Sequence, residues 1–105
     1  MSQSRVLLCK VSELPPGEMK RVDIEGHDPM VLCNTGEGFH LVDDECTHAI
    51  ASLSEGELDH HQLFCPLHGG SFDVRSGRAT GLPCKQALRT FPIDIQDGDV
   101  WFVQS

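Results

Sequence analysis

Two pairs of residues in the middle of the chain have the types and spacing of metal ligands. The first pair is Cys46 and His48, and the second pair, after sixteen intervening residues, is Cys65 and His68. Within a pair only one or two residues separate the ligands, so one tight loop can direct both at the same metal centre. Two thiolates and two imidazoles suit either one tetrahedral zinc ion or a 2Fe–2S cluster in which two histidines replace two cysteines on one iron.

The spacing inside the first pair argues against zinc. Structural zinc sites typically have two or more residues between the ligands of a pair, whereas a single residue separates Cys46 from His48. Chance is also a poor explanation, because lone Cys and His residues are common but two matched pairs in Gly-bearing loops are not. The residues of the two pairs alone leave a zinc-binding module open as an alternative.

The segments around these loops are typical of short β-strands, because branched and apolar residues alternate between turn signals. Predicted strands cover residues 5–10, 19–24, 30–33, 39–42, 58–64, 71–74, 86–90, 91–96 and 100–103, and one helical turn is expected over 49–53. The stretch from 43 to 83 is rich in Gly, Ser, His and Cys and lacks long apolar runs. The sequence therefore predicts one all-β domain over residues 1–105 with a loop-rich functional insert.

The acidic composition narrows the classes of partner. The chain of 105 residues has 16 acidic and 8 basic side chains and a formal net charge of -8. This charge argues against nucleic acid and anionic membrane surfaces, and it favours a partner with a basic docking patch. Without a signal-peptide pattern or a span of about twenty apolar residues, we expect a cytoplasmic protein. Cys9, Cys33 and Cys84 are then expected to be reduced thiols.

The sequence resembles the Rieske 2Fe–2S proteins in more than the four ligands. Residues 46–48 and 65–70 resemble the two cluster loops of that family, and residues 81–83, Gly-Leu-Pro, resemble its third, proline-bearing loop. The likeness extends over roughly the whole chain. It implies a Rieske-type fold of antiparallel β-sheets, in which residues of about 43–83 form the cluster-binding subdomain.

The resemblance also implies the cofactor and its ligands. The cofactor would be one Rieske-type 2Fe–2S cluster. Cys46 and Cys65 would bind its inner iron, and His48 and His68 would bind the outer iron near solvent. No catalytic residue is expected, because the cluster itself accepts and donates the electron.

Departures from the family pattern indicate a low-potential member. High-potential members have an extra cysteine in each loop, which together form a disulfide, but Ala51 and Leu67 stand at those positions here. Those members also have Ser and Tyr hydroxyls that donate to sulfur, whereas this chain has Gly70 and Phe72. Fewer donors to sulfur lower the potential. We expect a value near the bottom of the Rieske range, roughly -150 mV rather than +300 mV.

By size and motifs the chain resembles the free-standing Rieske ferredoxins of bacterial aromatic-ring dioxygenase systems, such as those for biphenyl and carbazole. This implies a monomeric one-electron carrier in aromatic hydrocarbon catabolism, and no enzyme activity of its own. Its partners would be an NAD(P)H-dependent, flavin-containing ferredoxin reductase and a terminal oxygenase. A small subunit of an assimilatory nitrite reductase is the alternative within related proteins. Those subunits often lack cluster ligands, and all four are present here.

Partners are expected to dock over the edge formed by His48 and His68, with apolar neighbours such as Ile50, Leu67 and Pro83. An acidic rim of Glu55, Glu57 and Asp59 could steer the encounter, or could be a solvated loop. Structural or solvated roles are expected for His27, His40, His60 and His61, a packing role for Cys84, and a core position for Trp101.

Overall fold

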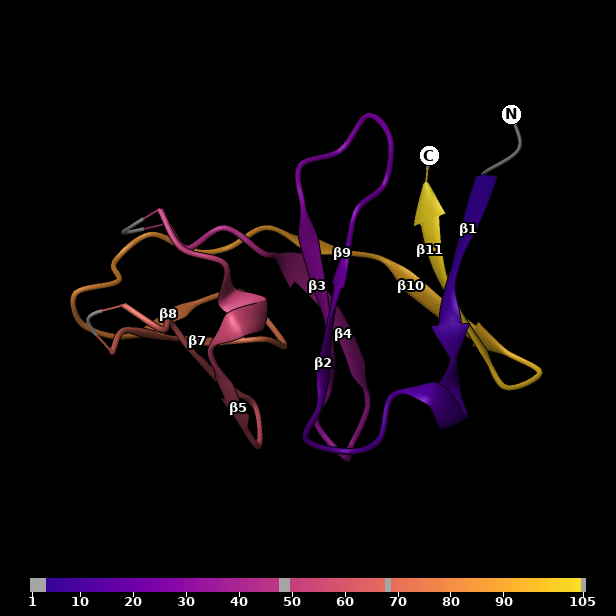
Figure 1. The fold of residues 1–105 in the computed structure, drawn as a ribbon, viewed down its shortest axis with the longest axis horizontal. Helices are drawn as coiled ribbons and strands as arrows, with labels where there is room; N and C mark the ends of the chain where they lie inside the picture. The colour runs from indigo at the N-terminus through magenta and orange to yellow at the C-terminus, as the bar shows by residue number, and fades with distance from the viewer. Residues whose placement is uncertain (1–3, 48–49, 68, 105) are drawn as a thin grey trace.

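The computed structural model describes residues 4–47, 50–67 and 69–104 and confirms the predicted all-β class (Figure 1). The strands are β1 (Ser4–Lys10), β2 (Met19–Val22), β3 (Met30–Asn34), β4 (Phe39–Asp43), β5 (Glu57–Asp59), β6 (Gln62–Phe64), β7 (Ser71–Asp73), β8 (Ala79–Gly81), β9 (Thr90–Phe91), β10 (Ile93–Gln96) and β11 (Asp99–Gln104). Two 3-10 turns, η1 (Val11–Glu13) and η2 (Leu53–Glu55), complete the described elements. No helix in these ranges is long and apolar enough to cross a membrane.

The strands form three antiparallel sheets with the orders β1-β11-β10, β2-β3-β4-β9 and β5-β6-β7-β8. The sheets follow one another along the long axis of the molecule, with β2-β3-β4-β9 in the middle (Figure 1). The third sheet lies in the segment where the sequence predicted the loop-rich insert.

Strand β3 is the centre of the structure, because both of its faces are covered. All five of its residues are buried. Met30 and Leu32 belong to the hydrophobic cluster shared with β1 and β11, whereas Val31 and Cys33 belong to the cluster shared with the third sheet. Alternate side chains of a strand point to opposite faces. A run of buried residues in β3 therefore joins two cores.

Residues 90–96 contribute a strand to each of two sheets. β9 pairs with β4, while β10 pairs with β11. Pro92 lies between them and has no N–H to donate to a sheet, although its carbonyl accepts from the Val103 N–H at 3.0 Å. The predicted single strand over 91–96 is therefore divided at Pro92, and the chain passes from one sheet to the other there.

Four further sequence predictions differ from the structure. The strand predicted over 58–64 is the hairpin β5–β6, which turns at His60 with φ of 54°. The helical turn expected over 49–53 is η2 at Leu53–Glu55, and Ala49 lies outside the described residues. Of residues 86–90 only Thr90 is in a strand, and β8 was not predicted. Short strands without branched residues, and turns without Gly or Pro, give little sequence signal.

The core position predicted for Trp101 is also wrong. Its neighbours Val100 and Phe102 are buried, so their side chains occupy the inner face of β11. Alternation places Trp101 on the opposite face, where it is only partly buried and lies across from Leu7.

A charged contact fastens the segment after the third sheet to β4. The Arg89 guanidinium donates to both carboxylate oxygens of Asp43, with Nε at 3.1 Å and Nη2 at 2.8 Å, and the Arg89 backbone N–H donates to the same carboxylate at 2.8 Å. Nη2 also pairs with Asp28 at 3.0 Å. The two carboxylates raise the pKa of Arg89. This arrangement fixes the start of the loop that carries Cys46.

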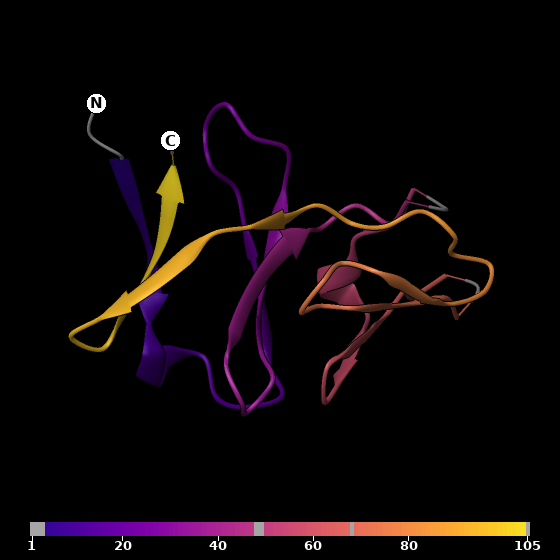
Figure 2. The ribbon, with the colours of Figure 1, turned by 180° about the vertical axis from the view of Figure 1, so that it is seen from behind.

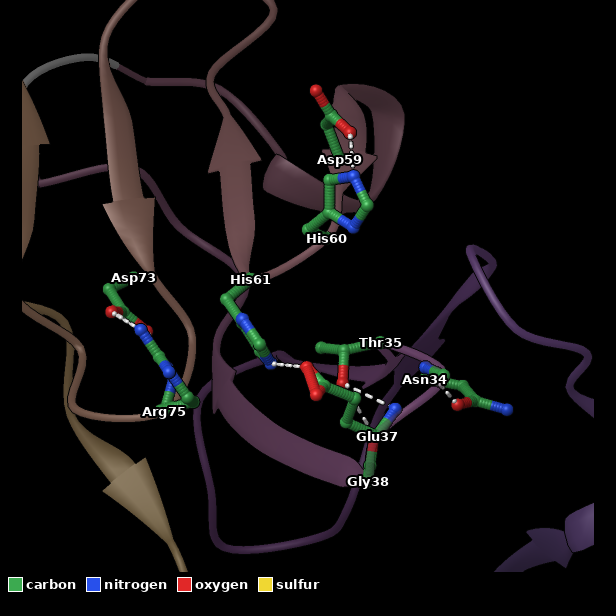
Figure 3. A network of polar contacts seen from close by, with 10 residues as sticks. Asn34, Thr35, Glu37, Gly38, Asp59, His60, His61, Asp73 and Arg75 are labelled. Atoms are coloured by element: carbon green, nitrogen blue, oxygen red, sulfur yellow. Dashed lines mark hydrogen bonds and ion pairs between the residues drawn. The ribbon is translucent and has the colours of Figure 1, made fainter.

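A second polar contact joins the third sheet to the turn before β4 (Figure 3). His61, at the β5–β6 turn, lies with its Nε2 3.1 Å from a carboxylate oxygen of Glu37. The Thr35 hydroxyl accepts from the Glu37 N–H at 3.2 Å and so holds that turn. Asp73 and Arg75 form their own ion pair nearby, at 2.8 Å. The hairpin turn of the middle sheet thus supports the third sheet from outside.

We predict that Arg89→Gln lowers the free energy of unfolding by about 1 kcal/mol. The substitution removes charge-assisted hydrogen bonds to a mostly buried carboxylate, and the solvent exposure of Arg89 limits the loss. The midpoint of thermal unfolding, followed by circular dichroism, should fall by about 4 to 8 °C. The matched control is Arg78→Gln, since the Arg78 side chain forms no hydrogen bond or ion pair with the described residues. Equal midpoints for the two variants would contradict a role for the Asp43 contact.

Candidate metal centre

Three loops meet at the end of the molecule farthest from the two termini (Figure 2). The first loop covers residues 43–53 and includes Cys46. The second loop covers residues 65–70, which begin with Cys65. The third loop covers residues 81–84 and ends at Cys84. The predicted ligands His48 and His68 lie outside the described residues, whereas Cys46 and Cys65 are both described.

The first loop is closed by its own backbone and by one buried carboxylate. The Cys46 N–H donates to the Ala51 carbonyl at 3.0 Å. Asp44 is 1% exposed, and its carboxylate accepts from the Ser54 N–H at 2.8 Å, while its carbonyl accepts from the Leu53 N–H at 2.6 Å. These bonds satisfy the backbone N–H groups at the start of η2 and hold Cys46 on a rigid turn.

The second loop closes in a similar way around Cys65. Its N–H donates to the Gly70 carbonyl at 2.7 Å, and Gly69 has φ of +72°, a conformation that glycine adopts without steric cost. The Leu67 N–H donates to the Cys65 sulfur. A backbone donor aimed at a cysteine sulfur stabilises the thiolate form, which is the form that binds metals.

The third loop packs closely against the second loop and against Ser71, the first residue of β7. The Cys84 N–H donates to the Gly81 carbonyl at 3.1 Å, and the peptide between Leu82 and Pro83 is cis. A Cβ atom at Gly81 would lie 2.5 Å from the Ser71 hydroxyl oxygen, and one at Gly70 would overlap the Cys84 sulfur. Glycines at these two positions therefore permit the close approach of the loops.

Three thiols gather where the loops meet. Cys46, Cys65 and Cys84 are each 4% exposed, and the sulfurs of Cys46 and Cys84 are 3.8 Å apart. Burial, with the neighbouring Cys46, raises the pKa of Cys65. Burial and the same neighbour raise the pKa of Cys84 to about 12. The packing role predicted for Cys84 is confirmed, but its position beside a predicted ligand was not foreseen.

The chemistry of this donor set fits an iron–sulfur cluster. Cys46 and Cys65 are adjacent and buried, and the Cys65 sulfur has a backbone donor, which favours a thiolate ligand. Because burial favours the protonated form of Cys65, binding of a metal group has to release a proton there. Within the described ranges no three His, Cys, Asp or Glu side chains are arranged around a single metal ion. Cys84 therefore does not complete a three-ligand site with the other two cysteines.

Comparison with known proteins gives the family. Residues 4–92 match the Rieske [2Fe-2S] domain. The chain belongs to the Rieske family. Its cofactor is a Rieske-type 2Fe–2S cluster, and the zinc alternative that the two Cys and two His left open is wrong.

Several ferredoxins resemble the chain over nearly its full length. It is 39% identical to ferredoxin CarAc of Metapseudomonas resinovorans, over 96% of this chain and 94% of that protein. It is 42% identical to the ferredoxin component of biphenyl 2,3-dioxygenase of Rhodococcus jostii strain RHA1, over 89% of this chain and 86% of that protein. The ferredoxin in a solved complex of reduced oxygenase and oxidised ferredoxin in carbazole 1,9a-dioxygenase is 38% identical, with a TM-score of 0.91 and coverage of 96% of this chain and 94% of that chain.

The nitrite reductase alternative finds weaker support. A small subunit of an NADH-dependent nitrite reductase from Mycobacterium tuberculosis superposes with a TM-score of 0.85 over 100% of this chain and 98% of that chain, at 15% identity. At that identity the likeness shows a shared fold and no shared function.

The side chains near the sulfurs fit the low-potential branch that the sequence indicated. Phe72 is fully buried in the core and has no hydroxyl group. The hydroxyl of Ser71, next to Gly70, lies 2.9 Å from that of Thr80, which in turn donates to Gln62 at 2.7 Å. These two hydroxyls are thus paired within the third sheet, and the Thr47 hydroxyl, next to Cys46, donates to the Gln86 carbonyl at 2.7 Å.

The other singled-out side chains have contacts outside the three loops. His27 lies 2.9 Å from Gln104 and edge-on to Phe102, and His61 pairs with Glu37. His60 pairs with Asp59, and burial together with His61 lowers the pKa of His40. Glu55, Glu57 and Asp59 are exposed on η2 and β5, which Figure 1 places away from the end where the loops meet.

We predict that Gly81→Ala weakens the packing of the third loop on the second. The new Cβ would lie 2.5 Å from the Ser71 hydroxyl oxygen, and such overpacking costs about 1 to 3 kcal/mol. The half-life of the visible absorbance of the cluster at raised temperature should shorten. Adding Ser71→Ala removes the contacting oxygen and should restore much of the loss. Gly38→Ala is the matched control, because its Cβ would meet no atom closer than 3.8 Å. An unchanged half-life in Gly81→Ala would contradict the proposed contact.

Proposed function

We propose that this protein is a one-electron carrier that passes electrons from an NAD(P)H-dependent flavoprotein reductase to the terminal oxygenase of an aromatic-ring dioxygenase system. The observation that carries the proposal is the full-length likeness to ferredoxin components of such systems, at 39% and 42% identity. In one solved structure a similar ferredoxin is complexed with an oxygenase. The protein has no substrate reaction of its own in this proposal, and it acts as a monomer within one domain.

Within this proposal Cys46, His48, Cys65 and His68 are the four cluster ligands. The two cysteines, which are buried, bind the inner iron, and the two histidines bind the outer iron. When bound, the cluster takes up and releases one electron. The closed first and second loops hold the sulfurs in place, and the Leu67 N–H offsets negative charge on the Cys65 sulfur.

Exposed apolar side chains around the loops suit a docking surface. Ile50, Leu67 and Leu82 are 97%, 46% and 76% exposed, and each comes from a different loop. We call these three residues the apolar tip. Exposed apolar residues gathered at one place are typical of contact surfaces. The proposed partners therefore dock at the apolar tip, where the electron path from the cluster is short.

The cytoplasm is the proposed location. The five cysteines are all described and none forms a disulfide. Retention of thiols is typical of proteins in a reducing compartment. The formal charge of -8 then serves solubility and steers partners with basic patches.

We predict that the purified protein is red-brown and contains about two iron and two acid-labile sulfide per chain. The reduced form should give an EPR spectrum with the low average g-value of mixed Cys and His ligation. His48→Cys and His68→Cys should each shift this spectrum toward all-cysteine character or lose the cluster, whereas His27→Cys, at a histidine paired with Gln104, should change nothing. One zinc and no iron in protein purified without air would rule out the electron-carrier proposal.

We predict that Leu67→Glu or Leu82→Glu slows electron transfer to the oxygenase by tenfold or more while the visible spectrum stays intact. A carboxylate placed in an apolar contact has to be desolvated without a partner. The measurement is stopped-flow oxidation of the reduced ferredoxin by the oxygenase. Leu7→Glu is the control, because Leu7 is 52% exposed but lies on β1, in the sheet at the other end of the molecule.

A salt series separates the apolar contribution from the electrostatic one. If charge steers the encounter, the rate should fall as ionic strength rises, and Glu55→Gln with Glu57→Gln should reduce this dependence. If the rate of electron transfer changes neither with salt nor with the two substitutions, the apolar tip is the main determinant of docking. Equal rates for Leu67→Glu and Leu7→Glu would show that the partner docks elsewhere.

A further inference from the structure

The thiol of Cys84 lies against the sulfur of Cys46. The two Sγ atoms are 3.8 Å apart, within the range of an S–H···S hydrogen bond, and both residues are 4% exposed. Under the ligand assignment proposed above, the bound form of Cys46 is a thiolate, which has no proton to donate. The donor in this pair is then Cys84. Water competes little for the contact, because both sulfurs are buried.

Independent evidence comes from Gly70. A Cβ atom at this position would overlap the Cys84 sulfur and lie 3.2 Å from the Cys84 Cβ. The Cys84 backbone is fixed by its N–H, which donates to the Gly81 carbonyl. The second loop thus leaves room for a thiol at a defined place, and any side chain at Gly70 would push that thiol away.

We propose that Cys84 donates a hydrogen bond to the Cys46 sulfur and thereby raises the reduction potential of the cluster. Reduction adds one electron, which the reductase supplies, and no covalent bond forms or breaks. Part of the added negative charge resides on the ligand sulfurs, so a donor to sulfur stabilises the reduced form more than the oxidised form. Cys84 is a positioning residue for this redox centre and does not ligate iron.

This role fits the other side chains around the sulfurs. Gly70 and Phe72 supply no hydroxyl, and the Ser71 hydroxyl is paired with Thr80. A thiol is a weaker donor than a hydroxyl. The Cys84 contact is thus compatible with a low-potential protein, whose potential would be lower still without it.

The first test measures the potentials of Cys84→Ala and Cys84→Ser by voltammetry. The control is Cys9→Ala, which removes another buried thiol, also 4% exposed, from the core beyond β3. Cys84→Ala should lower the equilibrium constant for reduction about threefold to tenfold. This corresponds to roughly 30 to 60 mV, since tenfold is about 59 mV for one electron. Cys84→Ser retains a donor and should keep a potential at or above that of Cys84→Ala, while Cys9→Ala should match the wild type.

The second test is a double-variant cycle with Gly70→Ala. In the wild-type background the added methyl group displaces the Cys84 thiol, so the potential should fall by about as much as in Cys84→Ala. In the Cys84→Ala background no donor is left to displace, so Gly70→Ala should add little. This non-additivity in the potential would show that both substitutions act through the Cys84 thiol, because changes that act at separate places would add.

Two outcomes would overturn the proposal. One is a Cys84→Ala protein with an intact visible spectrum and the same potential as Cys9→Ala. The other is loss of the cluster in both Cys84→Ala and Cys84→Ser, which would show that Cys84 serves packing alone. The ligand assignment on which the proposal rests is tested separately by Cys46→Ala. If Cys46→Ala retains the cluster, the ligand assignment itself is wrong. If Cys46→Ala loses the cluster and Cys84→Ala has an unchanged potential, only the hydrogen-bond proposal is wrong.

Discussion

The close approach of the second and third loops is the contact on which the cluster end of the molecule depends. At this end the described chain forms only short strands and one 3-10 turn, so no long element fixes the positions of the cysteines. Rigidity comes instead from close packing at two glycines, where Gly70 lies against the Cys84 side chain and Gly81 against Ser71 of β7. Interiors packed this closely transmit small displacements. The two glycines therefore matter to the site although neither has a side chain that could take part in its chemistry.

The remaining structure anchors these loops to a conventional β scaffold. Strand β3 has buried residues on both faces. It links the hydrophobic cluster shared with β1 and β11 to the cluster shared with the third sheet, which includes the cysteines of the three loops. Asp43, at the end of β4, is bound by Arg89, which returns from the third loop toward β9. Both ends of the cluster-binding segment are therefore tied to the same central sheet. This explains how a segment with so little regular structure can hold buried thiols.

Much of the fold could be predicted from sequence, for identifiable reasons, and of the four predicted ligands the structure describes Cys46 and Cys65. Short apolar and branched runs between turn signals predicted β1, β3, β4 and β11, and the Cys and His spacing predicted the two cluster loops. The turn at His60 was missed because it lacks Gly and Pro, and the division at Pro92 because the apolar alternation continues across it. The contact between Cys46 and Cys84 joins residues far apart in the chain. Local patterns cannot reveal such a pairing, because only the folded loops bring the two sulfurs together.

The apolar tip has a consequence for how long a complex can last. A shuttle that carries one electron has to leave each partner quickly, since residence on one partner delays the return to the other. In the proposed docking, three exposed apolar side chains would form a small contact, and small, transient interfaces are typical of redox partners. Among related complexes, affinity is set mainly by the rate of dissociation. The small size of the apolar tip thus favours rapid release of the partner. A larger apolar surface would raise the affinity but slow dissociation, and so slow repeated electron transfer.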